Sequence, residues 1–542
     1  MGALTLKTFP FELRGWDIQN FESIDPTDGF GSSTRVYISK QQIIQIEPDH
    51  SNNTSKVWLT DKGRQFFDGI FGYWGNKSEN NKDLVLKKES WRKNTKTLLK
   101  TLYLFEHCAC KTKKTHFFTI VFENLGIETL SLLKVMEQNY SFLKVRRAEN
   151  LSTSNDIEFN FQLNAVTNLS KIKSSTLCLL IGTNPRYEGS TLNLNLRQRY
   201  FKGNFKCLTL GSLVDLTFPS TFLGTSLKIL TDIAEGNSFA CQDFKAAKNP
   251  LLIFGNEFFK HMDSKNALEM LGTCKHTNVL NKNWNGVNIL NSTLTETGIQ
   301  SVANFAPLTS KDINELSSLY FINLTAQNIP NIKKIIETKL LKYTNVNISK
   351  YNIKELFFDQ NSRIKNNKIF IQSFSRPTKS KEYNFLPVKM FYENEETFIN
   401  TEGLIKRTSK LITKRKTREG RKLLRDLVKH FQNQYTSLNH KSNSILFFNG
   451  KKQSNFSSFT HFHYCAVEKL SSFTLPATPQ NQPFFVWKTN VTFKQRPFKI
   501  NNIKSKYWLD DFFTGGKDEY TRNSLVLSSC SQILRAQITN FF

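Results

Sequence analysis

The sequence predicts an α/β protein of several lobes, built on parallel sheets that carry helices on both faces. Short apolar runs bounded by Gly, Asn or Ser are mostly followed by segments of helical periodicity, which is the order of elements in doubly wound folds. The runs are apolar throughout, as in strands buried on both faces of a parallel sheet. They read STLCLLIGTNPR, FKCLTLGS, PLLIFGNEFF and SLYFIN. Because a single core stops growing at roughly 250–300 residues, a chain of 542 residues should form roughly two to four lobes.

A small β lobe is expected to precede these elements. Residues 35–47, RVYISKQQIIQIE, place apolar stretches on both sides of a polar turn, which is typical of a β-hairpin. A helix is predicted from Asp61 to Tyr73. A second helix, the strand HFFTIVF and a third, amphipathic helix should follow in that order. The apolar positions are Trp91, Leu98, Leu99, Leu102 and Tyr103 in the second helix and Ile127, Leu130, Leu133 and Met136 in the third.

Three parts are therefore expected along the chain. Residues 1–62 form the small β lobe, and residues 63–431 form the α/β lobes with doubly wound sheets. Residues 432–542 form an irregular C-terminal segment that wraps over the other lobes. Residues 330–385 and 432–500 give no clear pattern of elements, since the first is rich in Asn, Lys and Ile and the second mixes Ser, Asn, Gln and aromatic residues.

The chain is strongly basic, with 74 Lys and Arg against 45 Asp and Glu and a net charge of +29. Such a balance attracts nucleic acid, anionic membrane surfaces or acidic proteins without choosing among them. Translation of an AT-rich gene is a second source of the charge, because Lys, Asn, Ile and Phe are abundant while Gly and Pro are few. No apolar stretch is long enough to span a bilayer, so we expect no membrane-spanning helix.

The N-terminal sequence MGALTLKTFPFELRGWD has neither a signal-peptide core nor an amphipathic presequence. An organellar protein with this start would be made inside the organelle.

The spacing of the cysteines does not indicate a metal site. All eight are scattered, without a Cys-x2-Cys pair, so neither a zinc ribbon nor a ferredoxin ligand set is indicated and most should be free thiols. The segments His461–Cys465 and His107–Cys110 place ligand-type side chains close together, but a fourth ligand is not specified and an ordinary strand is favoured over a metal site. The cysteines are Cys108, Cys110, Cys178, Cys207, Cys241, Cys274, Cys465 and Cys530.

The turn Gly182-Thr183-Asn184-Pro185 follows a buried strand. Thr183 or Asn184 can cap the next helix and Pro185 suits its first turn, so free N–H groups could bind a phosphate there. A purely structural turn is favoured, because no Gly-x-Gly-x-x-Gly accompanies it. Gly29-x-Gly31 is not such a fingerprint either, since Thr34 stands in place of the third glycine.

The densest positive charge lies in residues 406–430, KRTSKLITKRKTREGRKLLRDLVKH. Arg418–Phe431 is predicted to be an amphipathic helix with a basic outer face. A solvated face, or one docked on an acidic neighbour, is favoured over nucleic-acid binding because no aromatic consensus of an RNA-binding module is present. The apolar stripe consists of Leu423, Leu424, Leu427, Val428 and Phe431.

Several segments resemble one family. GALTLKTFPFELRGWDIQNFESID resembles the segment of the respiratory complex I large iron–sulfur subunit that follows its last cluster motif, and ENLGIETLSLLKVMEQN resembles one of its helices. LCLLIGTNPRYEG with Asn193 and Arg197 resembles the Gly-Thr-Asn-Pro-Arg segment of that family. FINTEG, with Asn400, Glu402 and Gly403, and the C-terminal DDFFTGGKDEYTRNSLVLSSC resemble further segments. The resemblance implies a molybdopterin-oxidoreductase fold over most of the chain.

The resemblance also locates a missing cluster. Relatives that hold the extra iron–sulfur cluster use Cys-x2-Cys-x3-Cys-x27-Cys, and the corresponding positions here are Asp25, Asp28, Ser32 and Thr60. Hard oxygen ligands replace thiolates poorly on such a cluster, so we expect an empty site. A molybdenum ligand is not identifiable, and the resemblance implies that the pterin crevice near Gly182–Arg186 is vestigial. We therefore expect no catalytic, cofactor-binding or metal-binding residue in this chain, and no cofactor.

The resemblance implies a structural, non-catalytic subunit of proton-translocating NADH:ubiquinone oxidoreductase, in its peripheral arm on the matrix side of the mitochondrial inner membrane. The expected partners are a separate chain that carries the iron–sulfur clusters, as the product of a split gene, and other peripheral-arm subunits. The chain is expected to be encoded in the mitochondrion. We expect neither a nucleic-acid partner nor a membrane-spanning segment. Two alternatives remain open: an active molybdopterin oxidoreductase and a basic organellar RNA-binding protein.

Overall fold

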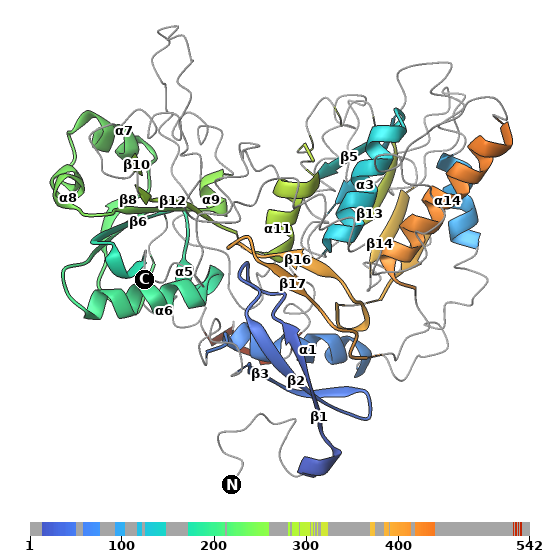
Figure 1. The fold of residues 1–542 in the computed structure, drawn as a ribbon, viewed down its shortest axis with the longest axis horizontal. Helices are drawn as coiled ribbons and strands as arrows, with labels where there is room; N and C mark the ends of the chain where they lie inside the picture. Colours follow the sequence, from blue (N-terminus) through green and yellow to red (C-terminus); the bar gives the residue numbers. More distant parts are fainter. Residues whose placement is uncertain are drawn as a thin grey trace, which may run out of the picture.

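Three lobes are visible in the computed structural model, with a small β lobe at the bottom of Figure 1 and two α/β lobes above it, one on each side. The described residues are 13–49, 58–75, 93–102, 116–121, 125–147, 172–211, 214–259, 280–281, 284–291, 293–303, 305–306, 308, 312, 316–323, 369–373, 384–389, 391–412, 418–438, 524, 526–527, 529–530 and 532–533.

The N-terminal lobe is an antiparallel sheet covered by one helix. The strand order is β1-β2-β3, and the predicted hairpin is confirmed because Lys40 and Gln41 form its turn with positive φ angles of 47° and 62°. Such angles match the twist of the paired strands. Phe66 and Phe67 of α1 are buried against Val36 and Ile46 of the sheet. The elements are η1 (Gly15–Asp17), β1 (Gln19–Ile24), β2 (Ser33–Ser39), β3 (Gln42–Pro48) and α1 (Asp61–Gly75).

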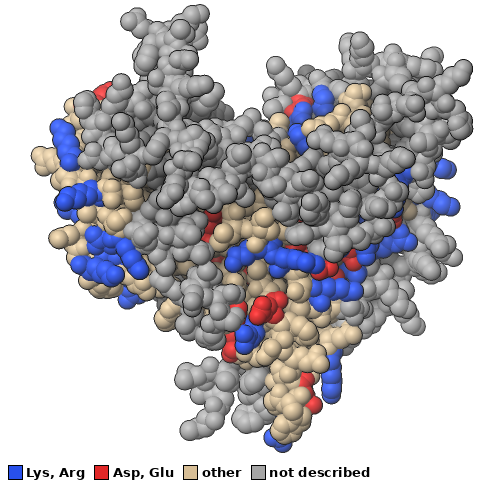
Figure 2. Space-filling model, in the orientation of Figure 1, with Lys and Arg blue, Asp and Glu red and all other residues tan. Residues whose placement is uncertain are grey.

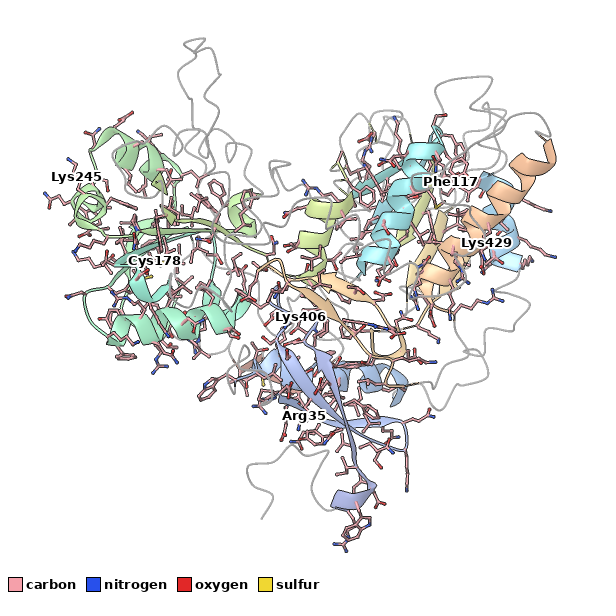
Figure 3. The ribbon with its side chains drawn as sticks, in the orientation of Figure 1. Arg35, Phe117, Cys178, Lys245, Lys406 and Lys429 are labelled. Carbon is pink, nitrogen blue, oxygen red and sulfur yellow. The ribbon has the colours of Figure 1, made fainter. Side chains whose placement is uncertain are left out.

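The first α/β lobe, on the right in Figure 1, contains a five-stranded parallel sheet of order β15-β14-β13-β4-β5. Helix α3, helix α14 and the helical residues 93–102 bury apolar side chains in one core with these strands, including Phe117, which Figure 3 labels. The elements are β4 (His116–Val121), α3 (Ile127–Asn139), β5 (Leu143–Arg147), β13 (Leu316–Ile322), β14 (Ile369–Ser373), β15 (Asn384–Pro387) and α14 (Gly420–Leu438).

The second α/β lobe, on the left in Figure 1, is inserted between β5 and β13 and has the parallel order β12-β9-β6-β7-β8. Leu177, Leu179 and Ile181 of β6 face one core and Cys178 and Leu180 face the other, so the sheet is buried on both faces as predicted. Its elements are β6 (Leu177–Ile181), α5 (Pro185–Glu188), α6 (Ser190–Phe201), β7 (Lys206–Leu210), β8 (Thr221–Gly224), α7 (Lys228–Glu235), α8 (Ala240–Ala246), β9 (Leu251–Gly255), α9 (Asn256–Phe259), β10 (Leu280–Asn281), β11 (Trp284–Asn285) and β12 (Val287–Leu290).

A set of short elements lies where the three lobes meet. Leu294, Phe391, Tyr392 and Phe398 share one core with the N-terminal sheet, so this junction is packed with apolar side chains. A π-helical turn follows α11, a geometry frequent at functional positions. The elements are α11 (Leu294–Gly298), the π-helix η4 (Ile299–Ala303), the 3-10 helix η7 (Phe391–Glu393), β16 (Thr397–Ile399) and β17 (Ile405–Arg407).

The predicted α/β class, with parallel sheets and a small N-terminal β lobe, is confirmed. The helix expected over Asp61–Tyr73 is present and ends at Gly75. Helix α3 differs from its prediction as a one-sided amphipathic helix, because Glu128, Ser131 and Leu132 are buried as well as the apolar stripe. Helix α3 is covered on further sides because α14, η4 and β16 also pack against it.

Some predictions fall outside the described residues or touch them only in part. Trp91, Tyr103, His107–Cys110 and His461–Cys465 lie outside them, as do nearly all of the residues assigned to the C-terminal segment. Where that segment is described, the hydroxyl of Ser524 donates to a carboxylate oxygen of Asp68 in α1 at 3.2 Å. In the part of the chain that the structure describes, the helices are too short or too polar to cross a bilayer.

Candidate functional site

Three of the four positions that the resemblance assigned to absent cluster ligands, Asp25, Asp28 and Ser32, lie in one buried loop between β1 and β2, and the fourth, Thr60, directly precedes α1. Asp25 is fully buried and Asp28 and Ser32 are nearly so. A methyl group built on Gly63 would lie 2.0 Å from Oδ2 of Asp25, so the first turn of α1, which follows Thr60, packs directly on that carboxylate. The positions that the resemblance singled out therefore lie near one another in the structure.

Asp28 organises this loop. Its Oδ1 accepts hydrogen bonds from the backbone N–H groups of Phe30 at 3.1 Å and Gly31 at 2.7 Å, and its Oδ2 accepts from the hydroxyl of Ser32 at 3.2 Å. Burial, followed by the negative charge of Asp25, raises the pKa of Asp28 to about 7. The buried side chain of Asp28 thus accepts the hydrogen bonds that hold the backbone of the loop in place.

The donor set does not fit an iron–sulfur cluster. Oδ1 of Asp25 accepts from the N–H and the hydroxyl of Thr27, at 2.8 Å and 2.6 Å, and Oγ1 of Thr60 accepts from the N–H of Gly63 at 2.8 Å, which caps α1. These oxygens are hard donors already engaged within the protein, whereas a cluster requires soft thiolates. Among the described residues, no group of three or more His, Cys, Asp and Glu side chains is placed to hold a metal ion.

The segment Asn400-Thr401-Glu402-Gly403 clamps this loop. Both the N–H and the hydroxyl of Thr401 donate to the carbonyl oxygen of Gly29, each at 2.8 Å. The amide of Asn400 donates to the carbonyl of Phe30 at 3.0 Å, while its oxygen accepts from the N–H groups of Glu402 and Leu404. The resemblance of FINTEG to a family segment therefore corresponds to a structural contact with the loop.

The same loop touches the second α/β lobe. A methyl group on Gly29 would lie 2.0 Å from the carbonyl oxygen of Asn291, and one on Gly189 would lie 2.7 Å from the ring of Phe30. Phe30 is also part of the apolar core of the second α/β lobe. Because the approach of these backbones leaves no room for a side chain, the loop fixes the N-terminal lobe against its neighbours.

The turn Gly182–Arg186 satisfies its own donors. Asn184 caps α5 by accepting from the N–H of Arg186 at 3.2 Å, with Pro185 in the first turn, as the sequence predicted. Oε2 of Glu188 accepts from the hydroxyl of Thr183 at 2.5 Å and from the N–H of Asn184 at 3.2 Å. The protein's own carboxylate therefore occupies the place that a phosphate would take.

This turn accordingly does not fit the phosphates of a pterin cofactor. The guanidinium of Arg186 pairs with the carboxylate of Asp215 at 2.6 Å, so this cation too is engaged within the chain. Asn193 donates to the carbonyl of Leu216 at 3.1 Å, and Arg197 lies over the ring of Phe201 at 5.5 Å. These residues, which carry part of the resemblance, serve packing and local hydrogen bonding.

Two carboxylates at the start of α3 form a pair that the sequence did not predict. Oε2 of Glu396 accepts from the N–H of Gly126 at 3.0 Å, and Oε2 of Glu128 accepts from the N–H of Thr397 at 3.1 Å. Removal from water, followed by the charge of Glu128, raises the pKa of Glu396 to about 8. An acidic residue in the first turn of a predicted helix was the only sequence signal, and Glu396 lies in a distant hairpin.

Helix α14 confirms the predicted amphipathic helix. Leu423, Leu424, Leu427 and Val428 are buried in the core of the first α/β lobe. The helix begins at Gly420 and continues to Leu438, beyond the predicted end at Phe431. The side chain of Phe431 lies outside the described residues.

Comparisons with known proteins agree with this architecture. The molybdopterin oxidoreductase family model matches residues 106–430. The NADH-ubiquinone oxidoreductase 75 kDa subunit of Reclinomonas americana is 29% identical over 352 residues, which are 62% of this chain and 50% of the relative. The NADH dehydrogenase [ubiquinone] iron-sulfur protein 1 of Solanum tuberosum is 27% identical, covering 54% of this chain and 38% of the relative.

A third relative shows the same likeness. The mitochondrial NADH-ubiquinone oxidoreductase 78 kDa subunit of Neurospora crassa is 26% identical over 57% of this chain and 41% of its own length. The chain thus spans half or less of the length of these curated relatives. The resemblance of the sequence to the large iron–sulfur subunit of complex I is confirmed by these matches.

Proposed function

The chain belongs to the molybdopterin oxidoreductase family, and from this membership we propose that it is a non-catalytic scaffold subunit of mitochondrial NADH:ubiquinone oxidoreductase. The names of the relatives, which are subunits of this enzyme in other organisms, support the assignment of the chain to this complex. The buried loop of Asp25, Asp28 and Ser32 carries the scaffold role. The carboxylates of Asp25 and Asp28 accept hydrogen bonds from within the loop, and the backbone of the loop packs on the second α/β lobe and on the β16–β17 hairpin. The contribution to catalysis is rigid placement of other subunits.

The redox centres would belong to a second chain. Thiolates are the ligands that iron–sulfur clusters require, and a Cys-x2-Cys ligand set is absent from this sequence. We propose that a separate polypeptide, the product of a split gene, carries the clusters of the relatives' iron–sulfur part and packs on this chain. Both would lie in the peripheral arm on the matrix side of the inner membrane, with this chain encoded in the mitochondrion.

The test is purification of the native NADH dehydrogenase complex of the organism. Mass spectrometry of the active fraction should identify this chain together with a second chain that holds the cluster cysteines. An uninterrupted large subunit with all of these cysteines in the same complex would contradict the split arrangement. Absence of this chain from every active fraction would contradict its assignment to the complex.

An active molybdenum or tungsten oxidoreductase is the second candidate, because the family model covers residues 106–430. The internal pairing of Glu188 and Arg186 in the Gly182–Arg186 turn argues against it. Elemental analysis of the purified chain separates the two candidates, since only the oxidoreductase would contain molybdenum or tungsten in stoichiometric amount. A basic RNA-binding protein would instead bind RNA with a steep dependence on salt.

A further inference from the structure

The hairpin strand β17 and the start of α14 present a basic face, defined here as Lys406, Arg407, Lys410, Arg418, Lys422 and Lys429. All of them are exposed except Lys406, which is partly buried. Figure 3 labels Lys406 at the junction of the lobes and Lys429 on α14. In Figure 2, Lys and Arg side chains run from the middle of the molecule towards the edge where α14 lies.

The orientation of this face is fixed by packing. Leu423, Leu424 and Leu427 are at most 3% exposed in the core of the first α/β lobe, so α14 cannot rotate about its axis. Lys422 lies outside this core with half of its side chain exposed. Burial of the apolar stripe therefore holds the positive charge outward, as it does for the polar side of any amphipathic helix.

We propose that this basic face is the docking surface for an acidic protein surface of another subunit, an inference that rests on the proposed function. Three carboxylates lie among the cations: Glu395 pairs with Arg407, Glu419 with Lys422 at 2.9 Å, and Asp426 with Arg418 at 3.8 Å. Cations outnumber these carboxylates, so an excess of positive charge remains. Complementary charge steers association and selects the partner.

A protein is favoured over a nucleic acid by the composition of the face. Carboxylates mixed with cations are ordinary at the polar rim of protein interfaces, whereas they repel the phosphates of a nucleic-acid backbone. Single-stranded RNA also requires aromatic side chains on which bases stack. Among the described residues of β17 and α14, the large exposed apolar side chain is that of Ile405, which is aliphatic.

The test exchanges charge on this face in the full chain within its complex. The variant Lys410→Glu/Lys429→Glu reverses two exposed charges, and Lys228→Glu/Lys245→Glu is the matched control on exposed positions of α7 and α8 in the other lobe. Because each exposed ion pair contributes up to about 1 kcal/mol, the first variant should bind the complex about tenfold more weakly. The control variant should remain bound to the complex to the same extent as the unaltered chain at every salt concentration.

Carbodiimide cross-linking of the unaltered complex tests the contact between the basic face and another subunit even if a variant fails to fold. This reagent joins lysine amines to carboxylates in contact, so Lys410, Lys422 or Lys429 should be linked to Asp or Glu of another subunit. Links from these lysines to this chain alone, or retention of Lys410→Glu/Lys429→Glu equal to the control, would overturn the inference. If the unaltered chain itself is absent from the active complex, the proposed function fails instead.

Discussion

Thr401 donates two hydrogen bonds to the carbonyl oxygen of Gly29, one from its N–H and one from its hydroxyl, both at 2.8 Å across 372 positions of sequence. This contact joins the β16–β17 hairpin to the buried loop between β1 and β2. The loop is held by Asp28 from inside and by Thr401 from outside. The loop therefore attaches the N-terminal lobe to the β16–β17 hairpin.

Replacing Thr401 by Val removes the hydroxyl bond and keeps the size of the side chain. A buried hydrogen bond contributes about 0.5–1.5 kcal/mol, and the N–H of residue 401 still reaches Gly29, so the free energy of unfolding should fall by about 1 kcal/mol. Urea denaturation measures the change. Thr231→Val, which removes an exposed hydrogen bond from the hydroxyl to the carbonyl oxygen of Lys228 within α7, should have little effect.

Gly29→Ala should be far more harmful, because the added methyl group meets the backbone oxygen of Asn291 at 2.0 Å. Backbone cannot give way as a flexible side chain does, so the loss should be roughly 3 kcal/mol or more. The control is Gly15→Ala, where the new Cβ meets no atom within 4 Å. Thermal melting compares Gly29→Ala with this control. Equal melting temperatures for both variants would show that the loop is not packed as described.

Glu396 should make stability depend on pH. Its pKa is raised from 4.5 to about 8, so the folded protein binds more protons than the unfolded chain between these values and stability falls as pH rises through this window. Glu396→Gln mimics the protonated form, so its stability relative to the unaltered protein should rise by about 1–2 kcal/mol as the pH rises from 5 to 9. This figure is discounted because residue 396 is only partly buried. Denaturation at several pH values tests this, and parallel pH profiles would refute it.

Glu188→Ala should open an anion-binding site that the carboxylate of Glu188 occupies in the unaltered protein. The hydroxyl of Thr183 and the N–H of Asn184 would lose their acceptor, which costs about 1–3 kcal/mol when the donors are buried. Sulfate should then restore part of the lost melting temperature of the variant and leave the unaltered protein unchanged. Sodium chloride at equal ionic strength is the control for a general salt effect.

The strands β4, β6, β7, β9 and β13 were predictable because each contains a short apolar run, as LCLLI of β6 does. Their distribution over two sheets was not, since β4 pairs with β13 only after the chain has built the whole second lobe. Runs buried on both faces look alike in either sheet. The burial of Glu128 was missed for a related reason, because its partner Thr397 comes from a distant hairpin.

At the site, Asp25, Asp28, Ser32 and Thr60 were singled out only by the resemblance, through the cysteine motif of relatives that hold the extra cluster. The clamp by Thr401 could not be predicted, because a hydrogen bond between such distant segments leaves no periodic pattern. Glu188 did leave a signal, since an acidic residue in the first turn after Asn-Pro is typical of a helix start that supplies its own acceptor.

Metal analysis and electron paramagnetic resonance of the pure chain test the central claim most directly. After anaerobic incubation with iron and sulfide and removal of the excess, the chain should hold far less than one metal ion per molecule and give no signal on reduction with dithionite. Stoichiometric iron or molybdenum, or a reducible centre in the spectrum, would show that the chain carries electrons itself and contradict its role as a scaffold.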